Sequence, residues 1–500
     1  MERAAESTLI EAAEPFSVDV LVPELDDELC ERARQARDPR FDGRFFIGVL
    51  TTGVYCRPIC KVRMPKRENV RFYPSAAAAA AAGFRPCLRC RPESSPRSPV
   101  WRGTETTVAR ALRLIESGML DRESVEALSE RLGIGARHLG RLFQRHLGAS
   151  PVQVAQTRRL HLAKKLLDET RLSMTSIADA SGYGSLRRFN EAFRATYGRT
   201  PSALRKARRA ARANALCLRL SYRPPFDFAT LLEFYAKRAI PGVETVEASV
   251  YRRTIALGES SGSIAVRPLD GELELMVDFP ETAALPNIVT RVRRMFDLDA
   301  DPLTIERDLR HDRELLPCIL ARPGLRVPGA WDGFELAVRA IAGQAITVAG
   351  ARTILGRIAE RFGRRTGDRV VFPTARVLAR ADLAGLGLSV ARAAAVRSVA
   401  AAVLEERLDL ETPRELQAIV RKLCAYDGIG AWTAHYIALR ALAHPDAFPA
   451  GDLGLCRGAE AAFGLSRGTL TARALERRSL SWRPWRAYAA QHLWAAYAER

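Results

Sequence analysis

Residues 423–452 read LCAYDGIGAWTAHYIALRALAHPDAFPAGD, and this stretch decides the fold that we expect for the second half of the chain. Gly428 and Gly430 flank Ile429 between two helical patterns, so the backbone can turn tightly there and approach another backbone closely. The next helix begins near Ala431, and its first N–H groups lack partners inside the helix, so a DNA phosphate can bind them. An ordinary joint between two helices, with Ile429 as an apolar plug, explains the same three residues equally well.

One carboxylate, Asp452, follows the helix that carries Trp432 and Tyr436, in a segment bounded by proline and glycine. A carboxylate near aromatic faces can stabilise a sugar cation as a base departs, or orient the water that captures the cation. The turn and the carboxylate together therefore favour a site that acts on DNA over a plain joint between helices.

This stretch resembles the helix-hairpin-helix DNA glycosylase superfamily and, within it, the 3-methyladenine DNA glycosylase II (AlkA) type. Further matching runs are YRPP at 222–225, RPGLRVPG at 322–329, AIAGQ at 340–344 and WRPWRAY at 482–488. The resemblance implies that Asp452 is catalytic. It implies contacts to DNA from Gly428, Gly430 and Gln344. It also implies an aromatic cleft for an extruded base, formed by Trp432, Tyr436, Phe234 and Trp494, although packing in an apolar core explains each of these rings equally well.

The type of cleavage is also implied by the resemblance, because relatives that cut the DNA strand carry a lysine where this chain has Trp432. Tryptophan cannot form a Schiff base, so we expect hydrolysis of the N-glycosidic bond without strand cleavage. A base alkylated at a ring nitrogen is cationic, and stacking on electron-rich rings contributes about 0.5–2 kcal/mol to its recognition. Extrusion from the duplex costs a few kcal/mol, least for a poorly paired base.

Two positions depart from the family pattern. Ala345 stands where the family has a leucine wedge that fills the gap left by the flipped nucleotide, and Leu453 stands where an aromatic residue would follow Asp452. A smaller wedge predicts weaker binding to duplex DNA unless Ile346 takes its place. The altered pocket predicts a shifted range of excised bases.

The overall composition points to a polyanionic partner. The chain of 500 residues carries a formal net charge of +20, with a pI near 10.1, and nucleic acid is the leading candidate for the partner. A chain of this length exceeds what one core usually serves, so several domains are expected. We expect no membrane segment and a location in the bacterial cytosol, associated with the nucleoid, because no apolar run is long enough to span a bilayer and the acidic start does not match a signal peptide.

Four of the nine cysteines are spaced like metal ligands. Cys56 and Cys60 form a C-x3-C pair, Cys87 and Cys90 form a C-x2-C pair, and 26 residues separate the two pairs. In a reducing compartment this pattern predicts one Zn²⁺ bound by four thiolates. A purely structural zinc site is one reading. The other is a reactive site, because a zinc-bound thiolate stays deprotonated and is a soft nucleophile that can take a methyl group.

The surrounding sequence, TTGVYCRP at 51–58, RENVRFY at 67–73 and AGFRPC at 82–87, resembles the amino-terminal sensor domain of the Ada family. The resemblance implies that Cys56 accepts a methyl group from a methylphosphotriester in DNA, whereas the spacing alone does not distinguish Cys56 from Cys60. The second methyl acceptor of that family, a cysteine in a Pro-Cys-His-Arg setting, is absent, so direct repair of O6-methylguanine is not expected.

Methylation of one thiolate makes the zinc cluster less negative by one unit. Less repulsion of phosphate follows, which predicts stronger DNA binding after methylation and a steeper salt dependence, by about 0.9 for each additional phosphate that the protein neutralises. The basic residues expected at this surface are Arg57, Lys61, Arg63, Lys66 and Arg67.

Residues 104–212 contain two similar helix-turn-helix patterns, the first at 124–133 and 136–146, the second at 175–183 and 185–197. The endings GASP at 148–151 and GRTP at 198–201, with a joining helix at 152–167, resemble the AraC transcription-factor family. Helices that present arginine and asparagine can enter the major groove, at two segments about ten base pairs apart. The side chains expected to face DNA are Arg137, His138, Arg141, Arg187, Arg188 and Asn190. Lys164, Lys165 and the tail 205–212 are expected to meet phosphates, and a merely solvated basic face is the alternative.

We expect a multidomain chain, mainly α with α+β parts. The predicted divisions are an unassigned start (1–26), a zinc-bound α/β sensor (27–92), a linker (93–103), an all-α double helix-turn-helix domain (104–212), an α+β subdomain (214–301) and a helical glycosylase domain (302–500).

The predicted function joins methyl sensing, promoter binding and excision of alkylated bases such as 3-methyladenine. Double-stranded DNA is the expected partner, both damaged and promoter DNA, together with RNA polymerase during activation. One alternative is a methylation-sensing regulator whose glycosylase domain is inactive. A second is an enzyme whose amino-terminal half only holds non-specific DNA.

Overall fold

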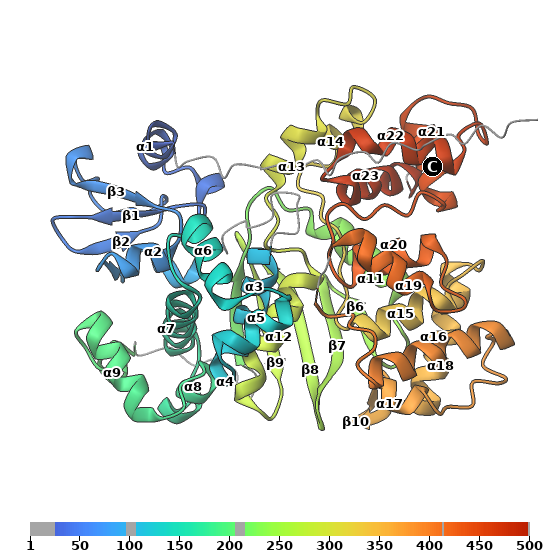
Figure 1. The fold of residues 1–500 in the computed structure, drawn as a ribbon, viewed down its shortest axis with the longest axis horizontal. Helices are drawn as coiled ribbons and strands as arrows, with labels where there is room; N and C mark the ends of the chain where they lie inside the picture. Colours follow the sequence, from blue (N-terminus) through green and yellow to red (C-terminus); the bar gives the residue numbers. More distant parts are fainter. Residues whose placement is uncertain (1–25, 97–106, 206–215, 413–414, 499–500) are drawn as a thin grey trace, which may run out of the picture.

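The computed structural model describes residues 26–96, 107–205, 216–412 and 415–498 (Figure 1). Nearly all of the unassigned start, most of the predicted linker and the basic tail beyond residue 205 lie outside these ranges. The multidomain, mainly helical fold class is confirmed. A five-stranded sheet stands at the centre, residues 26–205 lie on one side of it, and the helices of the carboxyl-terminal part lie on the other (Figure 1).

The amino-terminal module (residues 26–96) is a four-stranded sheet of order β3-β1-β2-β4 with two short helices. The first strand begins only at Phe46, because Asp38 caps a 3₁₀ turn that opens with Pro39. The alanine run at residues 76–81 forms a helix, and the Ser75 hydroxyl caps it by accepting from Ala78 N–H. The elements are α1 (Asp27–Ala36), η1 (Pro39–Phe41), β1 (Phe46–Val49), β2 (Val54–Cys56), η2 (Arg67–Asn69), β3 (Val70–Tyr73), α2 (Ala76–Ala81), β4 (Arg85–Pro86) and η3 (Pro92–Ser94).

Two helix-turn-helix units follow in residues 107–205 and share a long central helix, α7. Each short helix begins at a serine cap, Ser124 before α5 and Ser173 before α8, and the longer helices α6 and α9 end at left-handed Gly148 and Gly198. The helices are α3 (Thr107–Glu116), α4 (Met119–Arg122), α5 (Val125–Leu132), α6 (Ala136–Leu147), α7 (Pro151–Glu169), α8 (Met174–Ala180), α9 (Leu186–Tyr197) and α10 (Pro201–Leu204).

The central sheet has the strand order β5-β9-β8-β7-β6, and every neighbouring pair is antiparallel. Alternate residues such as Leu273, Leu275 and Val277 are buried, as the period of a half-buried strand requires. The elements are β5 (Leu216–Ser221), α11 (Phe228–Arg238), β6 (Glu244–Glu247), β7 (Val250–Leu257), β8 (Ser260–Leu269), β9 (Glu272–Asp278), η4 (Thr282–Ala284) and α12 (Leu285–Met295).

The remainder of the described chain is helical, apart from one hairpin that the sequence did not predict, at residues 364–371. Its turn contains Gly367 with a φ of +61°, which suits glycine. The elements are α13 (Pro302–Leu309), α14 (Leu316–Ala321), α15 (Gly333–Ala342), α16 (Val348–Phe362), β10 (Arg364–Thr366), β11 (Arg369–Val371), α17 (Ala375–Leu378), α18 (Val390–Leu404), α19 (Leu416–Cys424), α20 (Ala431–Arg440), α21 (Leu453–Ala462), α22 (Ala472–Ser479), η5 (Leu480–Trp482) and α23 (Arg486–Ala498).

Helices α7, α8 and α9 share one buried apolar cluster with the central sheet. Leu167, Ile177 and Phe193 belong to the same cluster as Leu218 and Leu275, and each is at most 2% exposed. The helix-turn-helix units (residues 107–205) and the central sheet that follows them therefore pack against each other through a common apolar core, and a linker is not their only connection. None of the described helices is both long and apolar enough to cross a membrane.

Candidate active site and metal centre

Asp452 forms the amino-terminal cap of α21 and is surrounded by hydrogen-bond donors. Its Oδ1 accepts from the backbone N–H of Leu455 and from the indole Nε1 of Trp494, both at 2.8 Å, and its Oδ2 accepts from Trp432 Nε1 at 3.1 Å. The side chain is half-buried, and no ion pair joins it to a basic group in the described part of the chain. Three donors therefore hold the carboxylate in one orientation.

A cavity of about 250 Å³ lies beside this carboxylate, between the central sheet and helices α15, α16 and α20. Asp452, Phe234, Trp432 and Tyr436 line it, and the Trp432 and Tyr436 rings are stacked with centroids 5.5 Å apart. Trp494 is not in the lining and reaches the site through its hydrogen bond to Asp452. The structure thus brings together the predicted acid and the predicted aromatic residues. The volume lies just below the range of about 300–1,000 Å³ typical of ligand pockets, which suits a small planar guest.

Several arginines that the sequence did not point to also line this cavity, and two of them, Arg238 and Arg440, lie over an aromatic ring. The guanidinium carbon of Arg238 lies 4.0 Å from the Phe234 ring centroid, and that of Arg440 lies 4.4 Å from the same centroid. Arg440 follows Trp432 and Tyr436 at intervals of four residues on α20, so all three share one helix face. This four-residue spacing is the sequence feature that could have identified Arg440 as part of the site.

The hairpin at residues 428–430 has the geometry expected of a close backbone turn. Gly428 has a φ of +83°, and an added Cβ would lie 2.8 Å from Ala395, so a side chain is excluded there. Gly430 caps α20 and has no atom within 4 Å of an added Cβ, so its outer side is open. Gln344 donates from Nε2 to Gly428 O at 2.8 Å and to Thr433 Oγ1 at 3.0 Å. Its amide nitrogen therefore braces the hairpin.

Ala345, which stands where the family has a leucine wedge, lies in an exposed loop next to the cavity. Ala345 has a φ of +52°, and Ile346, which is 38% exposed, lines the cavity. Leu453 is 68% exposed, so its side chain contributes little to the wall beside Asp452.

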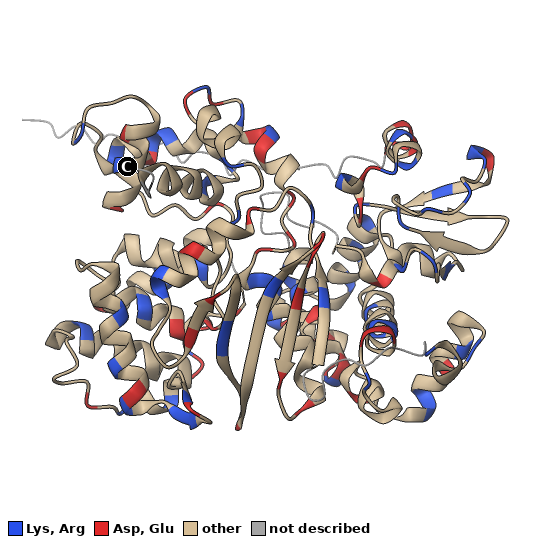
Figure 2. Cartoon of the chain, turned by 180° about the vertical axis from the view of Figure 1, so that it is seen from behind, with Lys and Arg blue, Asp and Glu red and all other residues tan. Residues whose placement is uncertain are grey.

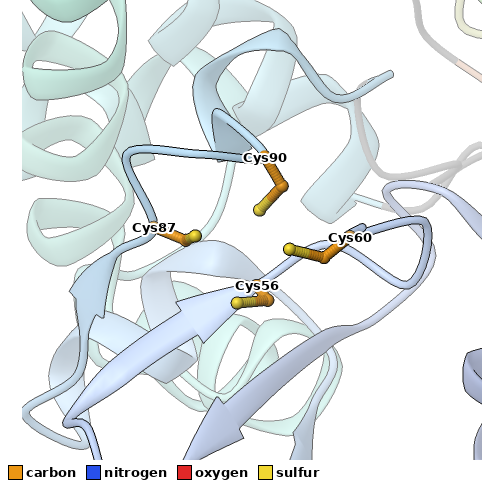
Figure 3. Close-up of side chains that lie close together, drawn as sticks. All are labelled: Cys56, Cys60, Cys87 and Cys90. Carbon is orange, nitrogen blue, oxygen red and sulfur yellow. The ribbon is translucent and has the colours of Figure 1, made fainter. Parts of the chain in front are cut away.

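The four predicted ligand cysteines converge in the amino-terminal module (Figure 3). Their sulfur atoms all lie within 4.8 Å of one another, and Cys56, Cys60 and Cys87 are buried while Cys90 is half-buried. Four soft thiolates at this spacing suit tetrahedral Zn²⁺, for which Zn–S bonds of ~2.3 Å are usual. The residues present fit the predicted zinc ion.

The basic surface expected around the cysteines is smaller than the sequence indicated. Arg57 does not face a phosphate, because its guanidinium is largely buried, pairs with Asp42 and donates to Cys90 O at 3.1 Å. Arg67 pairs with Asp27 at 2.5 Å. Lys61 and Arg63 are exposed. The expectation that Arg57 belongs to a phosphate-facing surface is wrong, since a carboxylate nearby in the fold captures it.

The predicted DNA-facing side chains of the helix-turn-helix units lie on the outer faces of α6 and α9. Arg137, His138 and Arg141 are exposed on α6, and Arg187 and Arg188 are exposed on α9. Asn190 is half-buried and donates from its amide to Leu186 O at 2.8 Å. Basic segments occur in every part of the ribbon seen from behind, so the positive charge is not confined to these two helices (Figure 2).

The expectation that Lys164 meets a phosphate is wrong. Its side chain is 4% exposed, and its Nζ lies 2.6 Å from Asp168 Oδ2 and 3.6 Å from Glu93 Oε1. Lys165 donates to the backbone carbonyl of Arg219, at the edge of the central sheet. The helical pattern did not reveal that this face of α7 packs against other modules.

The amino-terminal module is attached to the helix-turn-helix units by polar contacts next to the ligand cysteines. Tyr55, which precedes Cys56, has its hydroxyl 2.7 Å from His161 Nε2 on α7. Arg91, which follows Cys90, pairs with Asp168 at 3.1 Å and with Glu169 at 3.2 Å. The Ser75 hydroxyl donates to Leu147 O at the end of α6, at 2.7 Å. Residues beside two zinc ligands therefore touch the central helix directly.

Four family models match successive parts of this chain. They are described as the metal binding domain of Ada (residues 29–93), a helix-turn-helix domain (residues 128–207), the AlkA N-terminal domain (residues 217–332) and the HhH-GPD superfamily base excision DNA repair protein (residues 338–485).

Two curated relatives and one solved structure extend this similarity. The chain is 42% identical over 481 residues to a probable bifunctional transcriptional activator/DNA repair enzyme AlkA of Mycobacterium tuberculosis, covering 94% of this chain and 96% of that protein. It is 34% identical over 285 residues to DNA-3-methyladenine glycosylase 2 of Escherichia coli, covering 55% of this chain and 95% of that enzyme. The solved 3-methyladenine DNA-glycosylase from Archaeoglobus fulgidus shares the fold, with 21% identity and a TM-score of 0.50 over 56% of this chain and 98% of that one.

Proposed function

Because this chain belongs to the family of bifunctional transcriptional activator/DNA repair enzymes AlkA, we propose that it unites a methyl-accepting regulator with a DNA-3-methyladenine glycosylase in one molecule. The glycosylase is supported most directly by one observation, the carboxylate of Asp452 held by two indole N–H groups at the edge of an aromatic cavity. Release of free 3-methyladenine from an alkylated duplex by the full-length chain tests this proposal, and release at the background rate would contradict it.

The proposed reaction breaks the bond between C1′ of the sugar and the base nitrogen. The extruded base occupies the cavity beside Trp432 and Tyr436, and the electron pair of the breaking bond goes to the base. The carboxylate of Asp452 stabilises the cation that develops at C1′ and orients the water whose oxygen bonds to that carbon, while the water proton passes to the carboxylate or to solvent. Since Trp432 offers no amine, no Schiff base forms and the strand stays intact.

The regulator acts by a single methyl transfer. The Cys56 sulfur bonds to the methyl carbon of a phosphotriester while the carbon–oxygen bond breaks, which leaves an ordinary phosphodiester anion. Cys56, Cys60, Cys87 and Cys90 would hold the Zn²⁺, which when bound would keep the Cys56 sulfur deprotonated. We infer that the methylated chain binds promoter DNA through α6 and α9 and contacts RNA polymerase as an activator, and that it works in the bacterial cytosol at the nucleoid.

The effect of methylation at Cys56 can be transmitted to the helix-turn-helix units through the contacts that residues next to the ligand cysteines make with α7. We expect Tyr55→Phe to accept a methyl group normally but to lose part of the gain in promoter affinity that methylation gives, because His161 loses its hydrogen-bond partner. A hydrogen bond of this kind has a net worth of about 0.5–1.5 kcal/mol, so the gain in affinity should fall by a factor of about 2–12.

Tyr73→Phe is the matched control, because the Tyr73 ring packs on Phe84 and its hydroxyl makes no hydrogen bond that the structure describes. Titration of methylated proteins against the duplex that methylated wild type prefers measures the effect. Equal gains in affinity for Tyr55→Phe and wild type would rule out this route of transmission.

The double variant Arg187→Ala and Arg188→Ala should weaken DNA binding through α9. If both side chains meet phosphates, the slope of log K against log salt becomes shallower by about 0.9 for each phosphate that is no longer neutralised. If they read bases instead, discrimination against mismatched sites falls by about 1–3 kcal/mol for each base pair read, while the slope changes less. Binding measured at several salt concentrations separates these outcomes. Arg407→Ala, which removes an exposed arginine paired with Glu405 beyond α18, is the control. Unchanged affinity, slope and preference in the double variant would remove α9 from the DNA interface.

A further inference from the structure

Arg440 lies inside the aromatic enclosure that is proposed to receive the damaged base. Its guanidinium carbon is 4.4 Å from the Phe234 centroid, 5.4 Å from that of Tyr436 and 5.2 Å from that of Trp494. The side chain lines the cavity together with Asp452 and is only 3% exposed. The electron-rich rings expected to attract a cationic base therefore already hold a cation.

The charge of Arg440 is not balanced by a nearby acid. Its Nη1 donates to Pro328 O at 2.9 Å, its Nε is buried without a hydrogen-bond partner, and no carboxylate among the described residues lies within 4 Å of its guanidinium. Burial lowers the pKa of Arg440, but a guanidinium starts so far above neutrality that it remains charged. A buried, unpaired cation is costly, which points to a purpose other than stability.

Other arginines of the same cavity provide the contrast. Arg253 pairs with Glu335 at 2.7 Å, and Arg339 pairs with both Glu335 and Glu244 at 2.6 Å, so their charges are compensated. Arg238 resembles Arg440, because its guanidinium lies over Phe234 and makes no ion pair within the part of the chain that is described. Among the described residues, Arg238, Arg352 and Arg440 thus line the cavity without a carboxylate partner, and of these Arg238 and Arg440 lie over the Phe234 ring.

Building on the glycosylase function proposed above, we propose that Arg440, supported by Arg238, is a fixed positive charge that promotes departure of the base and thereby sets which bases the enzyme releases. It acts through charge at the cavity wall and donates no proton.

The effect on a neutral base follows from the electron count of the reaction. When the bond from C1′ to a neutral base breaks, the electron pair leaves the base nitrogen with a developing negative charge. Arg440 stabilises this charge only as it forms, so the interaction is stronger in the transition state than in the bound substrate. The positive charge should therefore speed up the chemical step for neutral bases.

For a cationic base, Arg440 has the opposite effect on binding but a similar effect on the chemical step. Bound next to Arg440, it is repelled, and the rings give it less attraction because a guanidinium already occupies them. Bond breakage neutralises the base and relieves the repulsion. Arg440 is therefore expected to weaken binding of a cationic lesion while still favouring its release.

The test uses full-length protein and duplexes with one hypoxanthine, which is neutral, or one 7-methylguanine, which is cationic. Single-turnover rates and dissociation constants are measured for wild type, Arg440→Gln, Arg440→Lys and Arg238→Gln. Arg440→Gln is expected to release hypoxanthine at least tenfold more slowly with little change in its dissociation constant, and to bind the 7-methylguanine duplex severalfold more tightly. Arg440→Lys, which keeps the charge, should retain most of the hypoxanthine rate.

The control for folding is the thermal unfolding of each variant. If Arg440→Gln does not fold, Arg238→Gln carries the test, and its ratio of hypoxanthine to 7-methylguanine release should shift in the same direction. Equal losses on both lesions, or identical behaviour of Arg440→Lys and Arg440→Gln, would assign Arg440 a packing role only and overturn the inference. Failure of the glycosylase function itself would look different, because wild type would then release neither base.

Discussion

Asp452→Asn is expected to release 3-methyladenine from alkylated DNA about 10²–10⁴ times more slowly than wild type, the usual loss when a charge or base that acts in the transition state is removed. Asparagine has the shape of aspartate but offers no negative charge to a sugar cation. Its amide also places an N–H₂ group opposite one of the two indole N–H donors that now point at the carboxylate. Release of free base from a methylated duplex, measured under single-turnover conditions, checks the rate.

The variant should fold, because asparagine is as good a helix cap as aspartate and the amide oxygen can still accept from Leu455 N–H and Trp494. Trp494→Phe is the companion variant, since it keeps an aromatic ring but removes one donor to the carboxylate, and it should lose less activity than Asp452→Asn. If Asp452→Asn releases base as fast as wild type, the carboxylate is not catalytic. If neither protein exceeds the background rate, the chain is a regulator alone.

Removal of one zinc ligand should have the largest effect on structure. Cys60→Ala is expected to abolish zinc binding and to unfold the amino-terminal module, since structural Zn²⁺ contributes about 10–16 kcal/mol in small zinc domains. Cys56, Cys60 and Cys87 belong to the buried cluster of this module, so a metal bound to them holds together the segments that form its core. Zinc content per chain and the rate of proteolysis within residues 26–96 measure the outcome.

Cys60 is the informative choice because Cys56 is the proposed methyl acceptor. Cys424→Ala is the matched control, as Cys424 is exposed at the end of α19 and lies outside the four-cysteine cluster, and it should retain one zinc per chain. Base release should persist in Cys60→Ala, since the cavity beside Asp452 is in another part of the fold. A Cys60→Ala protein with full zinc content and unchanged resistance to protease would contradict the metal assignment.

Features that depend on local chemistry were predictable from the sequence. Gly428 signalled a turn because its backbone needs a positive φ, the pattern that opens with Ser124 located the start of α5, and the two cysteine pairs identified the metal site. In each case neighbours in the chain determine the conformation or the ligand, so no knowledge of distant packing is required.

Features that depend on distant partners were missed. Lys164 looks like any solvated helix lysine until Glu93, far away in the chain, is placed beside it. Arg57 pairs with Asp42, which the sequence separates from it by strands β1 and β2 and the turn between them. Arg440 shares a helix face with Trp432 and Tyr436, but only its packing on Phe234 from α11 places its guanidinium inside the predicted aromatic cleft. Electrostatic partners across modules cannot be read from periodicity.

The common core of α7, α8 and α9 with the central sheet has a consequence for dosage. Since each half covers apolar surface of the other, a fragment cut between them near residue 210 would expose side chains such as Ile177 and Leu218, and should aggregate. Cells that make this protein cannot adjust the amount of one activity without the other. Every copy bound at a promoter therefore carries one glycosylase half, in a fixed ratio of one to one.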